Sequence, residues 1–204
     1  MSFVIISIEP VGNRRQRVCL DQGTDFLLYR GEVGKYGLKQ GEVLSEDQYQ
    51  FLVREVLSPR AVGKAMRLLE QRDYSEKGLR DKLMAASYPE EAVCRAIEYV
   101  KQAGYLDDSR LAASYVCCQQ EKKSKRRIAL DLLRKGFDRD LIDQVLDREY
   151  EASEDEQIRA LLRKKHYVAA HADQKEKGRL YRFLAYRGFS SAAIMKALQE
   201  MDDS

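Results

Sequence analysis

Two pairs of adjacent residues could support chemistry: the carboxylates Asp107 and Asp108, and the thiols Cys117 and Cys118. Paired carboxylates can hold a metal ion or share acid and base roles, and paired thiols can undergo disulfide exchange. We interpret the aspartates as helix caps, because they follow Gly104 and precede an expected helix whose first N–H groups need acceptors. Adjacent cysteines close only a small, strained ring. We therefore expect the four cysteines of the chain to be free thiols, mostly in the core.

Other catalytic patterns are missing from the sequence. His166 and His171 are five positions apart, which does not place both on one helix face, and no third ligand is evident nearby. The glycine-rich stretch 31–37 contains a lysine but lacks the following Ser or Thr of a phosphate loop. No metalloprotease, dinucleotide-binding or nucleophile-elbow motif occurs. We expect a protein that is not an enzyme and that needs no metal or cofactor.

Clustered positive charge is the strongest chemical signal. The 204 residues carry a formal net charge of only +3, yet the charges are segregated. Segment 122–135 holds seven basic residues and one acidic residue. Segment 137–156 holds two basic and nine acidic residues, and segment 159–187 holds nine basic and two acidic residues. Such clusters are typical of surfaces that meet nucleic-acid phosphates or an acidic protein. The candidate binding residues are Lys122, Lys123, Lys125, Arg126, Arg127, Arg134, Lys135, Arg163, Lys164 and Lys165.

A solvated surface is the alternative interpretation of these clusters, with the basic side chains paired to the acidic segment 137–156. Five cationic side chains fall within residues 122–127, however, and they repel one another. An anionic partner would relieve that repulsion. We therefore expect this cluster to bind a partner, and residues 163–165 to contribute.

An internal repeat indicates the elements that must position these charges. Three ten-residue stretches align without gaps, and each has an aromatic residue, a helix-start residue and then apolar pairs four positions apart. Their equivalent aromatics fit packing between helices better than base stacking. The aromatic residues are Tyr88, Phe137 and Phe189. We expect these to be buried together with the leucines that end the preceding helices, namely Leu83, Leu133 and Leu184.

The repeat predicts three modules of three helices each, over residues 60–103, 108–150 and 153–201. Only 9% of the residues are aromatic and tryptophan is absent, which favours an elongated, curved helical body over one dense core. The expected helices are 60–73, 75–86, 89–103, 108–121, 124–135, 138–150, 153–168, 174–187 and 190–201.

The first quarter of the chain differs in composition and predicts a small antiparallel sheet. Its short β-branched or aromatic runs are 3–8, 17–20 and 25–29, separated by glycine-containing turns. Ser45 is suited to cap a following helix, and Ser58 with the next proline is suited to start another. We place the domain boundary there, with residues 1–57 before it and 58–204 after it.

The sequence resembles the RecX family, bacterial regulators of the RecA recombinase, over about residues 60–200. The most specific match is Gly-Tyr-Leu-Asp-Asp at 104–108, and it stands in the family's order relative to the repeats. Further matches are Leu-Ala at 111–112, Lys-Arg-Arg-Ile at 125–128 and Lys-Gly-Phe at 135–137. The resemblance implies a protein that binds the RecA–single-stranded DNA filament and limits its growth, ATP hydrolysis and strand exchange in recombination and DNA repair.

Two expectations about partners follow. The filament, or single-stranded DNA within or outside it, is the expected partner. A helix-turn-helix-like regulator of transcription that binds duplex DNA is the alternative, with helix 124–135 in the major groove. No apolar run approaches the roughly 18–20 residues of a membrane helix, and the first residues lack the features of a signal peptide. We expect a cytoplasmic monomer that does not bind membranes.

Overall fold

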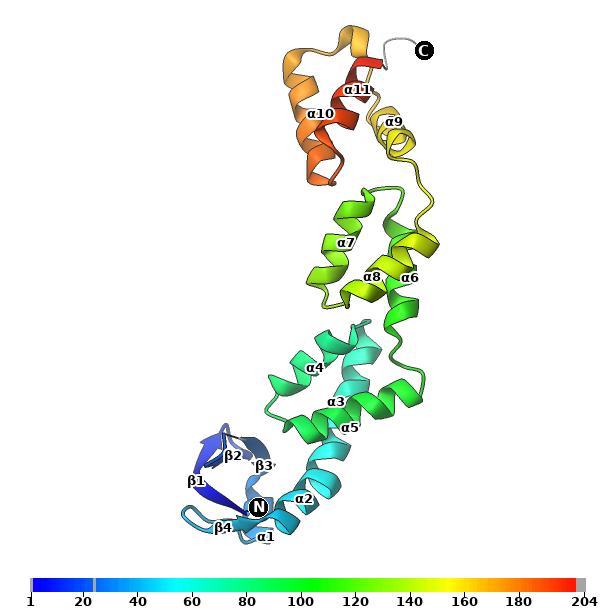
Figure 1. Ribbon diagram of the computed structural model, residues 1–204. Coiled ribbons are helices and arrows are strands. Elements are labelled where there is room, and N and C mark those ends of the chain that lie inside the picture. The colour runs from blue at the N-terminus through cyan, green and yellow to red at the C-terminus, as the bar shows by residue number, and fades with distance from the viewer. Residues whose placement is uncertain (1, 24, 201–204) are drawn as a thin grey trace. The chain divides into compact units, whose positions relative to one another are not determined.

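The protein is mostly helical with a small N-terminal sheet, as the sequence predicts. Its computed structural model describes residues 2–23 and 25–200. The chain divides into two compact units, Met1–Asp107 and Asp108–Ser204. The first contains the sheet and one three-helix module, and the second contains two further modules (Figure 1).

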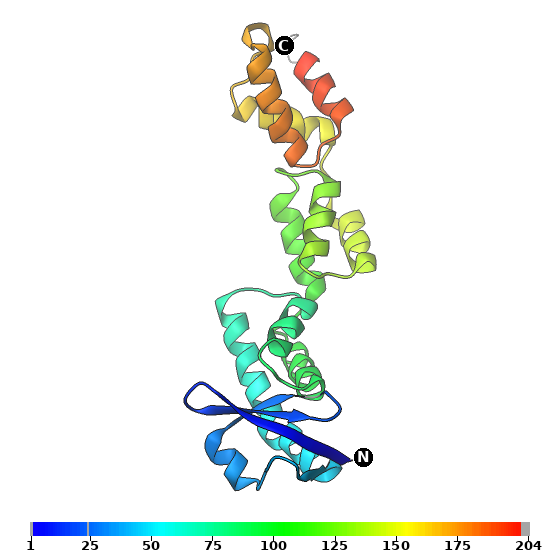
Figure 2. The same cartoon turned by 90° about the vertical axis from the view of Figure 1, so that its left-hand side faces the viewer.

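The N-terminal sheet is antiparallel and has the strand order β3-β2-β1-β4. It lies at the blue end of the chain in Figure 2. Its strands are β1 (Ser2–Val11), β2 (Arg15–Leu20), β3 (Phe26–Tyr29) and β4 (Val43–Ser45). Side chains alternate across β1, so that Phe3 and Ile5 are buried while Val4 and Ile6 are exposed. The three expected strands are confirmed. The fourth was not predicted, because three residues are too few to show an alternating pattern.

Helical structure runs without a break through α2 (Glu46–Phe51), a π-helical segment (Leu52–Leu57) and α3 (Ser58–Gln71). The cap at Ser45 is confirmed, since its Oγ accepts a hydrogen bond from Gln48 N at 3.2 Å. The cap at Ser58 is wrong: its backbone is helical, with φ −62° and ψ −47°, whereas a capping residue needs an extended backbone. Its Oγ instead donates to the carbonyl of Val53 at 2.7 Å. The division of the chain at residue 58 remains a prediction.

Three helices form each module. A short helix α1 (Arg30–Lys35) precedes the modules, and a 3₁₀ turn (Ala169–His171) lies between two helices of the third. The first module combines α3 with α4 (Glu76–Met84) and α5 (Glu90–Gln102). The second comprises α6 (Asp108–Gln119), α7 (Lys125–Arg134) and α8 (Arg139–Glu149). The third comprises α9 (Glu154–Lys164), α10 (Gln174–Tyr186) and α11 (Ser191–Glu200).

The same tight turn joins the second and third helices of every module. The aromatic residue after the turn donates its N–H to a carbonyl five residues earlier, at 3.2–3.4 Å in the three copies. The residue before the aromatic has a positive φ, namely 60° at Ser87, 88° at Gly136 and 85° at Gly188. Phe137 and Phe189 are buried, as expected, and Tyr88 is half-buried against the core.

One expected core residue is wrong. Leu83 and Leu184 are fully buried, but Leu133 is 40% exposed, and its neighbour Leu132 is fully buried in its place. The turn hydrogen bond gives the reason, because the carbonyl that accepts from Phe137 N–H belongs to Leu132. A residue five positions before the aromatic faces the core in all three modules. Leu133 is only four positions before it and is rotated toward solvent.

The cysteines are free thiols, but their expected burial is wrong for three of the four. Cys94, Cys117 and Cys118 are exposed, and Cys19 is partly buried. Within α6 the fully buried residues are Ala112 and Val116, one helical turn apart. Because each further residue turns by about 100°, the two positions after Val116 leave the buried face.

Candidate binding surface

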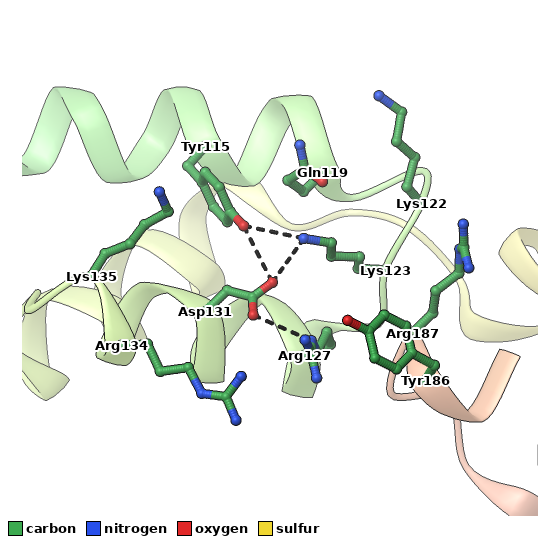
Figure 3. Close-up of a pocket in the computed structure, with 10 residues that line it drawn as sticks. All are labelled: Tyr115, Gln119, Lys122, Lys123, Arg127, Asp131, Arg134, Lys135, Tyr186 and Arg187. Atoms are coloured by element: carbon green, nitrogen blue, oxygen red, sulfur yellow. Dashed lines mark hydrogen bonds and ion pairs between the residues drawn. The ribbon is translucent and has the colours of Figure 1, made fainter. Parts of the chain in front are cut away.

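The second unit has an open hollow of about 550 Å³, lined by α6, α7 and the end of α10 (Figure 3). Six of its ten lining residues are basic and one is acidic. We call it the cationic hollow. Its lining residues are Tyr115, Gln119, Lys122, Lys123, Arg127, Asp131, Arg134, Lys135, Tyr186 and Arg187.

The local fold explains why these charges converge. Ser124 caps α7, with its Oγ accepting from Arg127 N at 3.2 Å. From there Arg127, Asp131 and Arg134 follow at spacings of four and three, so they share one face of α7. The turn between α6 and α7 adds Lys123, whose ammonium group points toward Asp131, and Lys122 (Figure 3). The hollow therefore combines one helix face with the turn that precedes it.

A single carboxylate organises the inner part of the hollow. Asp131 Oδ2 lies 2.8 Å from Lys123 Nζ, and its Oδ1 lies 3.2 Å from Arg127 Nε. The Tyr115 hydroxyl also donates to Oδ2, at 3.2 Å. Burial alone would raise the pKa of Asp131, but the hydrogen bond from Lys123 and the nearby positive charges lower it below the ordinary value. Asp131 therefore stays ionised and holds the two basic side chains in place.

Aromatic rings support the other cations. Lys135 Nζ lies 5.1 Å from the centre of the Tyr115 ring, and the Arg127 guanidinium lies 5.0 Å from the centre of the Tyr186 ring. Both distances fall within the range of cation–π attraction. Each ring therefore stabilises positive charge at the surface of the hollow.

The third module contributes residues to this surface through a polar junction with the second. Ser124 N donates to the carbonyl of Arg187 at 3.1 Å, and Ser124 Oγ donates to the carbonyl of Gly188 at 2.7 Å. A Cβ atom at Gly188 would lie 2.6 Å from Arg127 Cβ. The close approach therefore requires glycine at this position, and it brings Tyr186 and Arg187 to the hollow.

A second polar junction joins the same two modules. Gln157 is only 5% exposed, and its side-chain amide donates to the Tyr150 hydroxyl at 2.8 Å. It also donates to the backbone carbonyl of Gln120 in the turn that follows α6. Because a buried amide without a partner is costly, these bonds favour one arrangement of the two modules.

The structure sorts the predicted basic residues into different places. Five of them line the cationic hollow, whereas Lys125 Nζ pairs with Asp147 at 2.7 Å and Arg126 is exposed elsewhere. The Lys125 pair matches the alternative in which the acidic segment offsets the basic cluster. Binding by any of these side chains remains a prediction. The five in the hollow are Lys122, Lys123, Arg127, Arg134 and Lys135.

The second basic cluster lies at the end of α9. Arg163 and Lys164 are exposed in the last helical turn, where cations interact favourably with the helix dipole. Lys165 Nζ lies 5.1 Å from the centre of the Phe183 ring, which also contacts the Arg187 guanidinium at 3.7 Å. Lys165 is thus connected through Phe183 to the cationic hollow.

Five lining residues were not predicted as site residues: Tyr115, Gln119, Asp131, Tyr186 and Arg187. The sequence predicts Tyr115 only as part of a helix. The sequence does contain a signal that Tyr186 is exposed. It is the last residue of α10, directly before Arg-Gly-Phe, and it does not fit the four-residue spacing of the buried Leu180 and Leu184. Its approach to the second module depends on the junction at Gly188 and has no counterpart in the sequence pattern.

The role of Asp131 can be tested by acid unfolding. Its pKa is lowered on folding, so its contribution to stability is present above the ordinary pKa of about 3.8 and disappears as the pH falls through the lower folded value. The variant D131N should lower the free energy of unfolding at pH 7 by about 1–3 kcal/mol. It should also flatten the loss of stability below pH 4, measured by urea unfolding. If D131N lost stability below pH 4 as steeply as the unchanged protein, the proposed role of Asp131 would be contradicted.

Among residues 2–23 and 25–200, no group of three or more His, Cys, Asp or Glu side chains is placed to hold a metal ion. No helix in the same residues is long and apolar enough to cross a membrane.

Comparison with family models identifies all three modules. The model of the first RecX three-helix domain matches residues 61–99, the second matches 107–146 and the third matches 153–198. The matches follow the order of the modules and fall on the helices described above.

Individual relatives agree with the family models. The chain is 32% identical to regulatory protein RecX of Caldanaerobacter subterraneus subsp. tengcongensis over 167 residues, which cover 79% of this chain and 81% of the relative. It is 29% identical to regulatory protein RecX of Clostridium acetobutylicum over 205 residues, which cover 97% of this chain and 95% of the relative.

Two solved structures share the fold. A crystal structure of regulatory protein RecX has a TM-score of 0.56 at 22% identity and covers 97% of this chain and 99% of its own. The crystal structure of RecX from Lactobacillus salivarius has the same TM-score and identity, and it covers 71% of this chain and 96% of its own.

Proposed function

This chain belongs to the RecX family of regulatory proteins, and on that premise we propose that it binds the RecA–single-stranded DNA filament and limits filament growth, ATP hydrolysis and strand exchange. The observation that supports this proposal within the chain itself is the cationic hollow. A nucleoprotein filament offers what such a surface recognises, namely closely spaced phosphates and a repeating protein surface.

The mechanism that we propose is steric and electrostatic. Three similar modules can make separate contacts with successive parts of a repeating partner, and each contact raises the effective concentration of the next. Weak contacts then combine into tight binding without a single deep pocket. The bound protein would obstruct the addition of recombinase subunits and restrict the movements that accompany ATP hydrolysis. No catalytic group is required in this scheme.

Positive charge serves two purposes in this proposal. Basic side chains that neutralise phosphates release condensed counterions, which makes binding strong at low salt and weaker as salt rises. They also steer the approach of the protein to a strongly anionic filament. Asp131 keeps Lys123 and Arg127 in fixed positions, so that binding restricts their side-chain freedom less.

Fluorescence anisotropy of the labelled protein would test the proposal directly. We expect the tightest binding to RecA assembled on single-stranded DNA with a non-hydrolysable ATP analogue. Binding to RecA alone, to free single strands and to duplex DNA should be weaker. Recombinase ATP hydrolysis should fall over the same range of protein concentration, and the protein alone should not hydrolyse ATP.

The opposite order of affinities would contradict the proposal. Tight, sequence-selective binding to duplex DNA together with unchanged filament assembly would favour the transcription-regulator alternative. In the structure, the first turns of α7 are poorly suited to reading bases, because Lys125 is paired with Asp147 and Arg127 with Asp131. Asn and Gln, which read adenine in the major groove, are absent from α7.

A further inference from the structure

Tyr186 has an environment that packing does not explain. The residue is 72% exposed, more than any other large apolar or aromatic residue in the described part of the chain. Tyrosine is intermediate in burial between the apolar residues of protein cores and the charged residues of protein surfaces. An isolated exposed tyrosine would need no explanation, but this one lies at the rim of the cationic hollow (Figure 3).

The orientation of the ring is set by its neighbours. The Arg127 guanidinium covers it at 5.0 Å from the ring centre, and Arg127 is itself bonded to Asp131. The next two residues of the chain, Arg187 and Gly188, are held by hydrogen bonds from Ser124. The backbone and one neighbour of the ring are therefore fixed, while most of its surface faces solvent.

The other tyrosine of the hollow is already engaged. Tyr115 is partly buried, its hydroxyl bonds Asp131, and its ring lies near both Lys123 and Lys135. Of the two rings that line the hollow, Tyr186 is the one with a large area open to a ligand.

We propose that Tyr186 is a stacking platform for a base of single-stranded DNA whose adjacent phosphates lie in the cationic hollow. This inference rests on the proposed function and names the chemistry of the contact. Aromatic side chains beside a positively charged groove are the usual arrangement for binding single strands without sequence preference, because every base has a π face. A nearby guanidinium strengthens such stacking.

The size and composition of the hollow agree with a nucleotide unit. Its volume of about 550 Å³ lies within the range of sites that hold small ligands. Six basic residues line it, which suits phosphates. An acidic protein surface could also pair with the basic residues, but charge pairing does not require an exposed aromatic ring beside them. The ring therefore favours nucleic acid over an acidic protein at this site.

Two probes of equal length and charge separate stacking from charge attraction. One is a fluorescent oligothymidylate, and the other is the same strand with abasic sites in place of bases. We expect Y186A to weaken binding of oligothymidylate by about tenfold, within the range that removal of one stacked base produces. Binding of the abasic strand should change by less than about twofold, because the phosphate contacts persist. Y186F should bind both strands like the unchanged protein.

A matched control is available in the other unit. Tyr99 on α5 is 54% exposed and lies outside the hollow, so Y99A should leave both affinities unchanged. Thermal unfolding of each variant should match the unchanged protein, since the altered side chains are exposed. Equally weakened binding of both strands by Y186A would overturn the inference, because it would point to displaced Arg127 rather than a missing stack.

The same samples distinguish this inference from the proposed function. Suppose that the unchanged protein binds the filament and that Y186A binds oligothymidylate as tightly as the unchanged protein does. This result would overturn the stacking role but would be consistent with the filament role. A base-dependent Y186A effect without filament binding by the unchanged protein would support the stacking role and contradict the filament role. Tenfold weaker oligothymidylate binding together with weaker filament binding would support both.

Discussion

Replacing Lys122, Arg134 and Lys135 together by glutamine should weaken binding to the RecA–single-stranded DNA filament by about 100-fold. All three side chains line the cationic hollow and are exposed. We expect each lost contact to cost about 1 kcal/mol, less than the roughly 1.5–3 kcal/mol of a hydrogen bond to a charged group, and 1.4 kcal/mol corresponds to a factor of ten. Lys123 and Arg127 are left unchanged because they hold Asp131. Filament binding by anisotropy, at several salt concentrations, measures the effect.

Salt dependence identifies the group that the hollow meets. Each phosphate of a single strand that the protein no longer neutralises reduces the slope of log affinity against log salt by about 0.7, so three such phosphates should reduce it by about 2. If the hollow meets an acidic protein surface instead, the triple variant should bind more weakly without that systematic change. The result would therefore decide whether the hollow meets phosphates or protein.

A second triple variant controls for net charge. Arg139, Arg148 and Arg159 are exposed residues of the same unit that neither line the hollow nor belong to the predicted binding residues. Their joint replacement by glutamine removes the same charge, and we expect binding to weaken by less than about fivefold from reduced long-range attraction. Equal effects of the two triple variants would show that overall charge, not the hollow, drives binding. Each set should leave folding intact, because surface substitutions usually change stability by less than about 0.5 kcal/mol.

The variant G188A should destabilise the second unit by about 3 kcal/mol and disrupt the hollow with it. Gly188 has a φ of +85°, which is strained for any residue with a side chain. The added Cβ would also lie 2.6 Å from Arg127 Cβ and 2.7 Å from Ser124 Oγ. Relief of that overlap requires the two modules to separate or Arg127 to move. Urea unfolding and oligothymidylate binding measure the two consequences.

Two other glycines separate the causes. Gly104 has a φ of +76° but open space around it, so G104A should cost only the backbone strain, about 1–2 kcal/mol. Gly178 lies exposed within α10 and also has open space, so G178A should stabilise the protein by about 0.5–1 kcal/mol. A G188A variant as stable as G104A would show that the close approach to Ser124 and Arg127 is dispensable. Unchanged DNA binding by G188A would show that the hollow does not need the third module.

The helical modules could be predicted closely because their signals are local. Apolar pairs four positions apart and an aromatic residue after each turn repeat in the sequence, and the helix bounds agree to within a few residues. The exact buried leucine was harder to identify. Adjacent leucines at 132 and 133 satisfy the same pattern, and only the turn hydrogen bond from Phe137 determines which one faces the core.

The cationic surface could be predicted only in part. Charge clustering identified five of the basic residues that line the hollow, since four of them belong to α7 or the turn before it and the fifth follows directly. The same clustering did not distinguish Lys125, which faces Asp147, from Arg127, which faces Asp131. Each residue of a helix is turned by about 100° from the one before it, so Lys125 and Arg127 point to different sides of α7. The number of charges in a segment does not show which way each side chain points.

The sequence by itself determined the fold class, the number and order of the modules and the segregation of charge, because each depends on residues close together in the chain. Only the tertiary structure showed that Tyr186 and Arg187 join Lys122 and Arg134 at one surface. The first pair is separated from the second by more than fifty positions. Their approach depends on the hydrogen bonds of Ser124 with the turn at Gly188, and long-range contacts of this kind have no periodic signal in a single sequence.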